Sequence, residues 1–272
     1  MSYWMNLPKE YRKGKFVILP IEYEKDVTYG RGASLGSKEI IKASEQLEYY
    51  DCEIEKEAFL QGIELLEPIK SNEPEEIINK VSNTVKENKN KFIIGIGGDH
   101  AVTIGLTTEL DEDVSVIILD AHADFFHSWN GSEQNHRCVS QRLINKHNLA
   151  LIGIRAMDKD ENELIKNNEN VHLVKSNNYD LEKVKQILPK LKQKVYISVD
   201  VDVFDPSFIR NTGTPEPGGL SWNQIMELLQ LIFQEKEVIG ADVVEFAPQE
   251  NYRAEAYALA KLVYRLIGLK AK

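Results

Sequence analysis

The chain has 272 residues, of which 42% are hydrophobic, so it is long enough to bury a sizeable core. Its formal net charge of -10 argues against a nucleic-acid or anionic-membrane partner and favours a cationic ligand. The two cysteines, Cys52 and Cys138, form neither a disulfide framework nor a thiolate metal motif. The first residues, MSYWMNLPKEYRKGK, lack the apolar core of a signal peptide, and no run reaches transmembrane length. We therefore expect a cytoplasmic protein.

Strand and helix signals alternate along the chain without a long linker, which predicts one α/β domain over residues 1–272. Strands are expected at Phe16–Leu19, Phe92–Ile96, Val114–Leu119, Leu149–Ile154, Val195–Val199 and Val238–Val244. Helices are expected at Lys38–Glu48, Glu75–Glu87, Cys138–Lys146, Asp180–Lys192, Trp222–Gln234 and Tyr252–Leu269. Ser221 and Gln224 form a capping box at the start of the helix from Trp222. This alternation predicts a mostly parallel sheet covered by helices on both faces.

Three metal-binding side chains follow the apolar run Val114–Leu119. The sequence Asp120-Ala121-His122-Ala123-Asp124 places two carboxylates and an imidazole at the end of the buried strand predicted there. Like charges this close are unfavourable unless a cation neutralises them. The alternative is a solvated polar turn after the strand.

Three other strands end in the same way. The run Phe92–Ile96 leads to His100, the run Val195–Val199 leads to Asp200 and Asp202, and the strand ending at Val244 leads to Glu245. Residues at i and i+2 share one face of an extended segment. In an open parallel sheet, ligands bind beyond the carboxyl ends of the strands. The repeated pattern favours a common site over coincidence.

The candidate ligands outnumber what one divalent ion needs. They are His100, Asp120, His122, Asp124, Asp200 and Asp202. Four carboxylates and two imidazoles without a thiolate suit two Mn²⁺ ions best, with Fe²⁺, Co²⁺, Ni²⁺ or Zn²⁺ as alternatives, whereas Mg²⁺ takes fewer imidazoles. Two ions ~3.5–4 Å apart can share a hydroxide, which provides a nucleophile at neutral pH. The implied chemistry is hydrolysis.

Four ordered motifs now resemble a known family. They are GGDH at 97–100, DAHAD at 120–124, SVDVDVFDPSF at 198–208 with TGTPEPGGL at 212–220, and DVVEFAP at 242–248. Together they look like the signatures of the ureohydrolases, the family of arginase and agmatinase. The resemblance implies a three-layer α/β/α fold of the arginase type, a binuclear manganese centre, and a homo-oligomer that is a trimer or a hexamer.

The resemblance also implies a role for each site residue. Asp120 and Asp200 match bridging carboxylates, His100 and Asp124 the further ligands of one ion, His122 and Asp202 those of the other, Glu245 the carboxylate that holds the substrate guanidinium, and His136 the proton-shuttling histidine. A carboxylate can accept two parallel hydrogen bonds from a guanidinium. Histidine is suited to protonating the leaving amine, because it titrates near neutral pH.

Several of these assignments have alternatives. His136 can instead be a solvated loop histidine, and His127, nearer the metal motif in sequence, is expected at the pocket rim or the surface. Asp205 precedes Pro206 and is expected to stabilise a turn and not to bind metal.

The loop from Phe125 to Asn135 departs from arginases, which carry small polar residues there. Phe125, Phe126 and Trp129 predict an apolar pocket wall that disfavours the α-carboxylate of arginine. The segment around Arg137 and the stretch that begins at Glu245 look closer to agmatinase sequences than to arginase sequences. We therefore expect cleavage of agmatine to putrescine and urea by a metal-bridging hydroxide. Alternatives are arginine, guanidinobutyrate, aminopropylagmatine or guanidine as the substrate, or a non-catalytic protein of the same fold.

Overall fold

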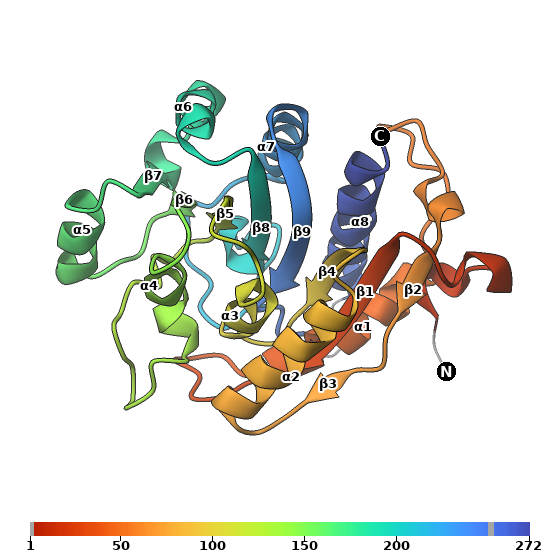
Figure 1. The fold of residues 1–272 in the computed structure, drawn as a ribbon, viewed down its shortest axis with the longest axis horizontal. Helices are drawn as coiled ribbons and strands as arrows, with labels where there is room; N and C mark the ends of the chain where they lie inside the picture. Colours follow the sequence, from red (N-terminus) through yellow and green to blue (C-terminus); the bar gives the residue numbers. More distant parts are fainter. Residues whose placement is uncertain (1–2, 250–252) are drawn as a thin grey trace.

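The computed structural model describes residues 3–249 and 253–272, and its centre is a nine-stranded sheet (Figure 1). The strands are β1 (Phe16–Glu22), β2 (Ile63–Leu65), β3 (Ile69–Lys70), β4 (Phe92–Ile96), β5 (Val114–Leu119), β6 (Leu149–Ile154), β7 (Val171–Lys175), β8 (Lys194–Asp200) and β9 (Glu237–Val244). Their order is β2-β1-β4-β9-β8-β5-β6-β7, with β3 also paired to β1. Each of these pairings is parallel, which confirms the predicted sheet.

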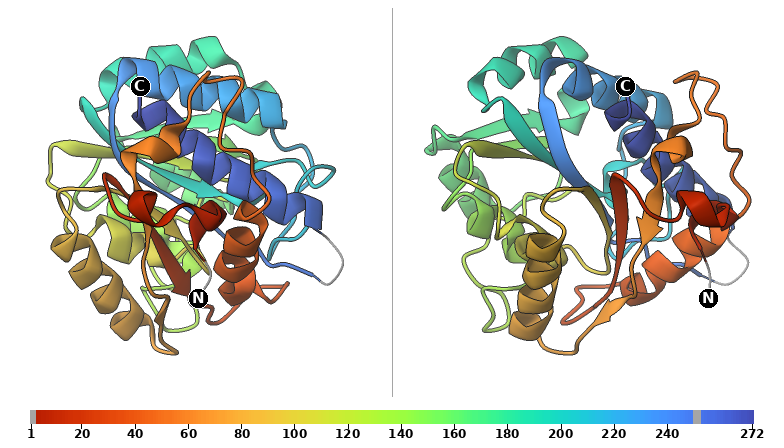
Figure 2. Two further views of the ribbon diagram at one scale, coloured as in Figure 1. Left: turned by 90° about the vertical axis from the view of Figure 1, so that its right-hand side faces the viewer. Right: turned by 45° about the vertical axis from the view of Figure 1, so that its right-hand side comes forward.

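Helices cover both faces of the sheet and form the outer layers (Figures 1 and 2). They are α1 (Gly36–Ser44), α2 (Pro74–Glu87), α3 (Val102–Thr107), α4 (Val139–Leu143), α5 (Lys159–Lys166), α6 (Leu181–Ile187), α7 (Trp222–Glu235) and α8 (Arg253–Lys270). Helices α1, α6, α7 and α8 pack in one buried core, and α2 to α5 pack in a second core on the opposite face. The three-layer α/β/α prediction is confirmed. Among the described residues, no helix has both the length and the hydropathy needed to cross a bilayer.

The inner strands are apolar on both faces because each face meets a helical layer. On β5, Ile117 and Leu119 enter one core, whereas Val116 and Ile118 enter the other. Alternate residues of a strand point to opposite faces, so a two-sided sheet requires a nearly continuous apolar run. This requirement explains why β4, β5 and β6 match the predicted strands residue for residue.

The strand order brings distant motifs together. Strands β4, β9, β8 and β5 are consecutive neighbours in the sheet, although β9 comes last in the sequence. The register pairs Leu119 with Val199 and Asp200 with Val244, so these strands end at nearly the same level. The residues that follow all four strands therefore lie along one edge of the sheet.

Several elements differ from the sequence-based expectation. Strand β7 and helices α3 and α5 were not predicted. The two helices were missed because α3 is only six residues long and buried almost all round, and because α5 is mostly polar. The helix expected at Cys138–Lys146 is a 3₁₀ turn followed by the short α4, and the helix expected at Asp180–Lys192 ends as α6 at Ile187 before a 3₁₀ turn containing Pro189. The capping box of Ser221 and Gln224 is confirmed. Tyr252, the expected start of the last helix, lies outside the described residues.

A buried ion pair ties α8 to the segment before β2. Arg265 Nε lies 2.8 Å from Asp51 Oδ2, and Lys261 Nζ lies 3.3 Å from the same oxygen. Arg265 and Asp51 are 1% and 2% exposed. Burial alone would raise the pKa of Asp51, but the charges of Arg265 and Lys261 outweigh it and hold the pKa below its usual value.

We expect Arg265→Met to lower the free energy of unfolding by about 3 kcal/mol, because it leaves the buried Asp51 carboxylate without its main partner. Urea denaturation measures the change. The pKa of Asp51 is lower in the folded than in the unfolded chain, so its contribution exists above the unfolded pKa and disappears as pH falls through the folded pKa. The difference between variant and wild type should therefore shrink in acid. Lys194→Met, which removes an exposed pair with Asp113, is the control and should change nothing.

Candidate metal centre

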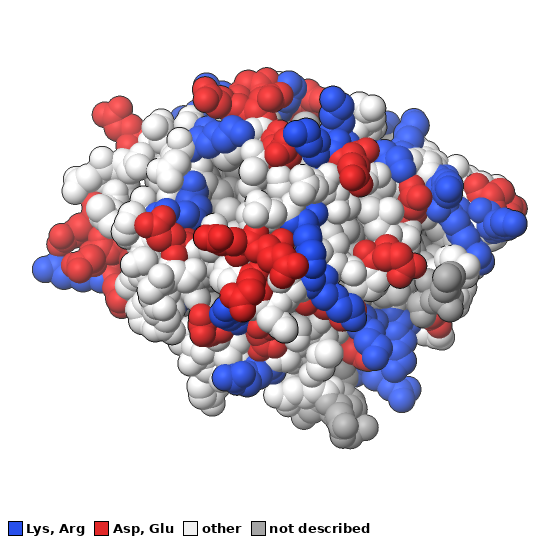
Figure 3. Space-filling model, turned by 60° about the horizontal axis from the view of Figure 1, so that its bottom comes forward, with Lys and Arg blue, Asp and Glu red and all other residues white. Residues whose placement is uncertain are grey.

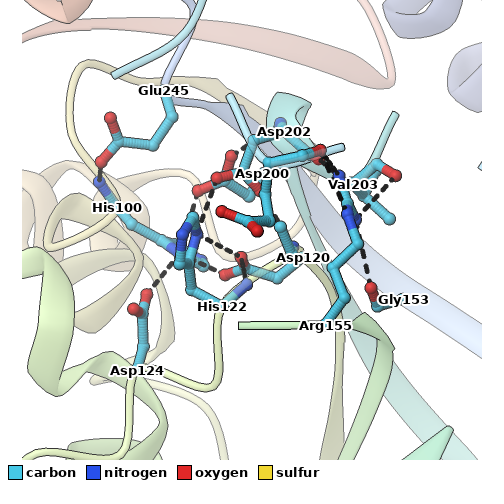
Figure 4. A network of polar contacts seen from close by, with 12 residues as sticks. His100, Asp120, His122, Asp124, Gly153, Arg155, Asp200, Asp202, Val203 and Glu245 are labelled. Atoms are coloured by element: carbon cyan, nitrogen blue, oxygen red, sulfur yellow. Dashed lines mark hydrogen bonds and ion pairs between the residues drawn. The ribbon is translucent and has the colours of Figure 1, made fainter. Parts of the chain in front are cut away.

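Six side chains from the ends of β4, β5 and β8 converge on one point (Figure 4). They are the six predicted ligands His100, Asp120, His122, Asp124, Asp200 and Asp202. His100 Nδ1 lies 3.1 Å from Asp120 Oδ2, 3.0 Å from Asp124 Oδ2 and 3.4 Å from Asp200 Oδ2. His122 Nδ1 lies 2.8 Å from Asp202 Oδ2 and 3.7 Å from Asp120 Oδ1.

These donors form two adjoining groups. His100, Asp120 and Asp200 form one group, and Asp120, His122 and Asp202 form the other. The donor atoms within each group lie within 4.8 Å of one another. Asp120 belongs to both groups.

Two buried atoms at the centre indicate that the site fits a metal. His100 Nδ1 and Asp120 Oδ2 are fully enclosed, yet neither has a hydrogen-bond partner among the described residues. They lie 3.1 Å apart but do not meet hydrogen-bond geometry. Enclosed polar atoms without partners are unfavourable, and a divalent cation bound by both atoms would remove that cost.

The pKa values describe a site that must hold either protons or a cation. Burial and the charges of Asp202 and Asp120 raise the pKa of Asp200 well above its usual value. Burial and Asp120 raise the pKa of Asp124 to about 6. Burial opposes the charged form of His122, but Asp202 and Asp120 outweigh it and raise its pKa to about 12. Metal ions bind the deprotonated ligands, so they would displace these protons.

Backbone N–H groups fix the orientation of the carboxylates. Asp120 Oδ1 accepts the His122 N–H at 2.6 Å, Asp202 Oδ1 accepts the Ala121 N–H at 2.9 Å, and Asp200 Oδ1 accepts the Asp202 N–H at 2.9 Å. For Asp200 and Asp202 the other oxygen is the one nearest an imidazole, whereas Asp120 faces His100 with Oδ2 and His122 with Oδ1. Asp124 adopts a left-handed backbone with φ of 50°, a conformation that costs free energy and is concentrated at functional sites.

A chain of buried hydrogen bonds orients His100 and was not predicted from the sequence. His100 Nε2 lies 3.0 Å from Ser198 Oγ, and Ser198 Oγ donates to Asp242 Oδ1 at 2.6 Å. Tyr196 and Thr103 hydroxyls donate to Asp242 Oδ2. This contact to Nε2 directs Nδ1 toward the carboxylates. The available signal was a pair of polar residues inside the apolar strands β8 and β9.

Arg155 was also missed, because a single arginine after β6 gives no motif. Its guanidinium donates to the carbonyl oxygens of Gly153, Asp202, Val203, Phe204, Glu216 and Pro217. It therefore joins the turn after β8 to the loop at 216–217. Figure 4 shows Arg155 with two of these partners, Gly153 and Val203. Burial lowers the pKa of Arg155, but the usual pKa of an arginine lies far above neutrality. The side chain therefore keeps its charge beside Asp202.

Glu245 lies on the same edge of the sheet, beside His100. Its Oε1 accepts the His100 N–H at 2.7 Å, and its own N–H donates to Gly98 at 2.8 Å. Its φ of 66° is again left-handed. Burial and the charge of Asp99 raise the pKa of Glu245 well above its usual value. Asp99, which was not predicted as a site residue, is buried and has its pKa raised to about 7, chiefly by burial.

A cavity of about 410 Å³ opens onto the ligand groups and is also lined by Glu245 and His136. Burial and the charge of Arg137 lower the pKa of His136 to about 4. His127 instead lies on the surface, 3.3 Å from Glu133, as expected. Asp205 accepts the N–H groups of Ser207, Gly218 and Gly219, which confirms its role in a turn.

The predicted aromatic wall is largely wrong. Phe125 is 2% exposed and packs in the core behind the cavity. Trp129 is absent from the cavity lining and packs edge-on against Phe126. The Arg137 guanidinium lies over both rings, 4.4 Å from the centre of Phe126 and 3.9 Å from that of Trp129. On this side the cavity is therefore lined by Phe126 and by Arg137, whose guanidinium is attracted to the aromatic faces.

A parallel α/β sheet with two adjoining His/Asp groups at its strand ends defines the class of two-metal α/β hydrolases. The Arginase family model matches residues 14–268. The chain belongs to the arginase family, and it is an agmatinase-like ureohydrolase, a binuclear-metal enzyme that hydrolyses guanidino groups.

Individual relatives agree with this family. The chain is 36% identical to an N(1)-aminopropylagmatine ureohydrolase of Thermus thermophilus, over 96% of this chain and 92% of that protein. It is 29% identical to an agmatinase of Pyrococcus horikoshii, over 100% and 98%. The crystal structure of agmatine ureohydrolase of Thermoplasma volcanium superposes with a TM-score of 0.88 at 26% identity, over 99% of this chain and 94% of that one.

We expect Ser198→Ala to weaken metal retention by about 10- to 100-fold, because it removes the group that orients His100. Metal analysis after dialysis against graded chelator measures the change. Ser115→Ala is the matched control, since Ser115 is an equally buried strand serine whose hydroxyl bonds Lys192 N–H instead. Equal metal retention in the two variants would contradict the orienting role of Ser198.

Proposed function

We propose that the protein cleaves the guanidino group of a small cationic substrate, with agmatine giving putrescine and urea as the preferred reaction. The observation that supports this most directly is that members of both ligand groups line one cavity together with Glu245. A guanidinium needs a carboxylate partner, and its hydrolysis needs an activated water. The cavity offers residues for both.

In this proposal Glu245 binds the guanidinium. Its Oε1 is already held by the His100 N–H, so the carboxylate is oriented before the substrate arrives. A cation beside Glu245 would favour its ionised form, which offsets the raised pKa. The two carboxylate oxygens can accept parallel N–H bonds and hold the central carbon of the substrate in a defined position.

We propose that His100, Asp120, Asp124 and Asp200 would hold one ion, and that His122 and Asp202 would hold the other together with Asp120 and Asp200. When bound, the two ions would lower the pKa of a water and so supply a nucleophile at neutral pH. Oxygen-rich ligands with two imidazoles favour Mn²⁺. By family resemblance we also propose a homo-oligomer, a trimer or a hexamer, and we keep the cytoplasm as the expected location, with no nucleic-acid or membrane partner.

His136 is the proposed proton carrier for the leaving amine. It lines the cavity together with Glu245, whereas His127 does not. The charge of Arg137 contributes to its low pKa, so the imidazole is neutral at neutral pH and can take up a proton during the reaction.

The charges around the cavity favour a cationic substrate tail. The carboxylates of Asp158 and Glu216 line it, and acidic side chains gather at the centre of the face toward which the carboxyl ends of β8 and β9 point (Figure 3). Carboxylates at this position attract a distal ammonium and repel an α-carboxylate. The second candidate substrate is N(1)-aminopropylagmatine, which carries a further ammonium. It is proposed because the Thermus thermophilus relative is an N(1)-aminopropylagmatine ureohydrolase.

We expect His136→Ala to lower kcat by a factor of about 10²–10⁴, the usual loss for a general acid–base group, while metal content stays unchanged. Urea release by the metal-reconstituted protein measures turnover. His127→Ala is the matched control, because it removes an imidazole from the surface, and it should keep full activity. Full turnover in His136→Ala would move the proton-transfer role to another residue.

We expect kcat/KM for agmatine to exceed that for arginine by at least about 100-fold, which corresponds to about 2.7 kcal/mol of transition-state discrimination. A urea-release screen with added Mn²⁺ should compare agmatine, N(1)-aminopropylagmatine, guanidinobutyrate, arginine and guanidine. Comparable values for agmatine and arginine would contradict the assigned specificity but not the hydrolytic chemistry. An absence of urea from every compound would contradict the proposed activity itself.

A further inference from the structure

The segment 23–32, between β1 and α1, closes one side of the cavity through Val27, Thr28 and Gly30. Near its start, Tyr23 O accepts the Asp99 N–H at 3.0 Å and Asp99 Oδ2 accepts the Lys25 N–H at 2.9 Å. Near its end, the Gly30 N–H donates to Gly213 O at 2.8 Å. The segment is therefore held at both ends, so Thr28 has a defined position beside the cavity.

The only side-chain hydrogen bond of His136 within the described part of the chain is made to this segment. His136 Nε2 lies 2.9 Å from Thr28 Oγ1. The other ring nitrogen, Nδ1, is enclosed and has no hydrogen-bond partner among the described residues. The backbone next to His136 is held separately, because Asn135 Oδ1 accepts the Arg137 N–H at 3.0 Å and Arg137 O accepts the Phe126 N–H at 3.1 Å.

We propose that Thr28 is a positioning residue whose hydroxyl sets the orientation of the His136 ring in the cavity. This inference rests on the proposed role of His136 as proton carrier. Other contacts fix where the His136 backbone lies, but they do not fix the rotation of its ring. The Thr28 hydroxyl supplies that constraint from a different part of the chain, 108 residues away.

The chemistry of a hydroxyl suits this task. Threonine both donates and accepts hydrogen bonds. It can accept an N–H from Nε2 when the ring is protonated and can donate to a bare Nε2 when it is not. The contact can therefore persist while the ring gains and loses a proton, and a carboxylate or an amide N–H at this position would favour only one of the two states.

The test compares Thr28→Val, which removes the hydroxyl at nearly constant shape, with Thr28→Ser, which keeps it. We expect Thr28→Val to lower kcat about tenfold with little change in KM or metal content, because the hydrogen bond is exposed and water can replace its orienting effect only in part. Thr28→Ser should restore most of the activity. Thr84→Val is the matched control, since among the described residues Thr84 Oγ1 bonds only the Lys80 carbonyl on α2, away from the cavity. It should behave as wild type.

Combination with His136→Ala separates this inference from the function on which it rests. In the His136→Ala background, Thr28→Val should cause no further loss, because the group that it positions is gone. Unchanged turnover in Thr28→Val, equal losses in the Val and Ser variants, or a full additional loss in the double variant would overturn the positioning role while leaving His136 in place. Full activity of the single His136→Ala variant would overturn the proposed role of His136 and this inference with it.

Discussion

The arrangement of the site depends on mutual repulsion between buried carboxylates. Asp120, Asp200 and Asp202 lie close together and almost fully enclosed, where charge is poorly solvated. Such a group is stable only with compensating positive charge. Burial opposes a charge on His122, but Asp202 and Asp120 outweigh it and raise its pKa, so the imidazole can supply part of this charge. A divalent cation would supply more, and the repulsion between the carboxylates would therefore favour metal binding.

The fold holds this cluster together with rigid parts. Parallel strands aligned in register deliver the ligands to one edge, and backbone N–H groups of the following turns hold one oxygen of each carboxylate. Arg155 then ties those turns to a neighbouring loop through backbone carbonyls. Because these contacts belong to packed strands and their turns, they hold the site side chains in fixed orientations, and electrostatic catalysis depends on such preorganisation.

Around this rigid centre the cavity has a divided charge. Arg137, held on Phe126 and Trp129, brings a positive charge next to His136, whereas Asp158 and Glu216 contribute negative charge to the same lining. Burial and the positive charge of Arg137 lower the pKa of His136, and the negative charge would attract the cationic tail of a substrate. In the proposed function, one cavity would thus serve proton transfer and recognition through charges of opposite sign.

The sequence alone determined the parallel α/β class, the innermost strands and the six side chains that converge at the site, because apolar runs that end in Asp, His or Glu are a local signal. Only the tertiary structure decided that β9 lies between β4 and β8, since strand order depends on how the helices cross the sheet. It also decided the supporting contacts of Asp242, Arg155 and Thr28, which join residues far apart in the chain. The aromatic loop shows the limit most clearly. Its composition predicted an apolar wall, but Phe125 is buried in the core and the Arg137 guanidinium lies over Phe126 and Trp129. No local sequence pattern indicates which way a side chain faces in a loop.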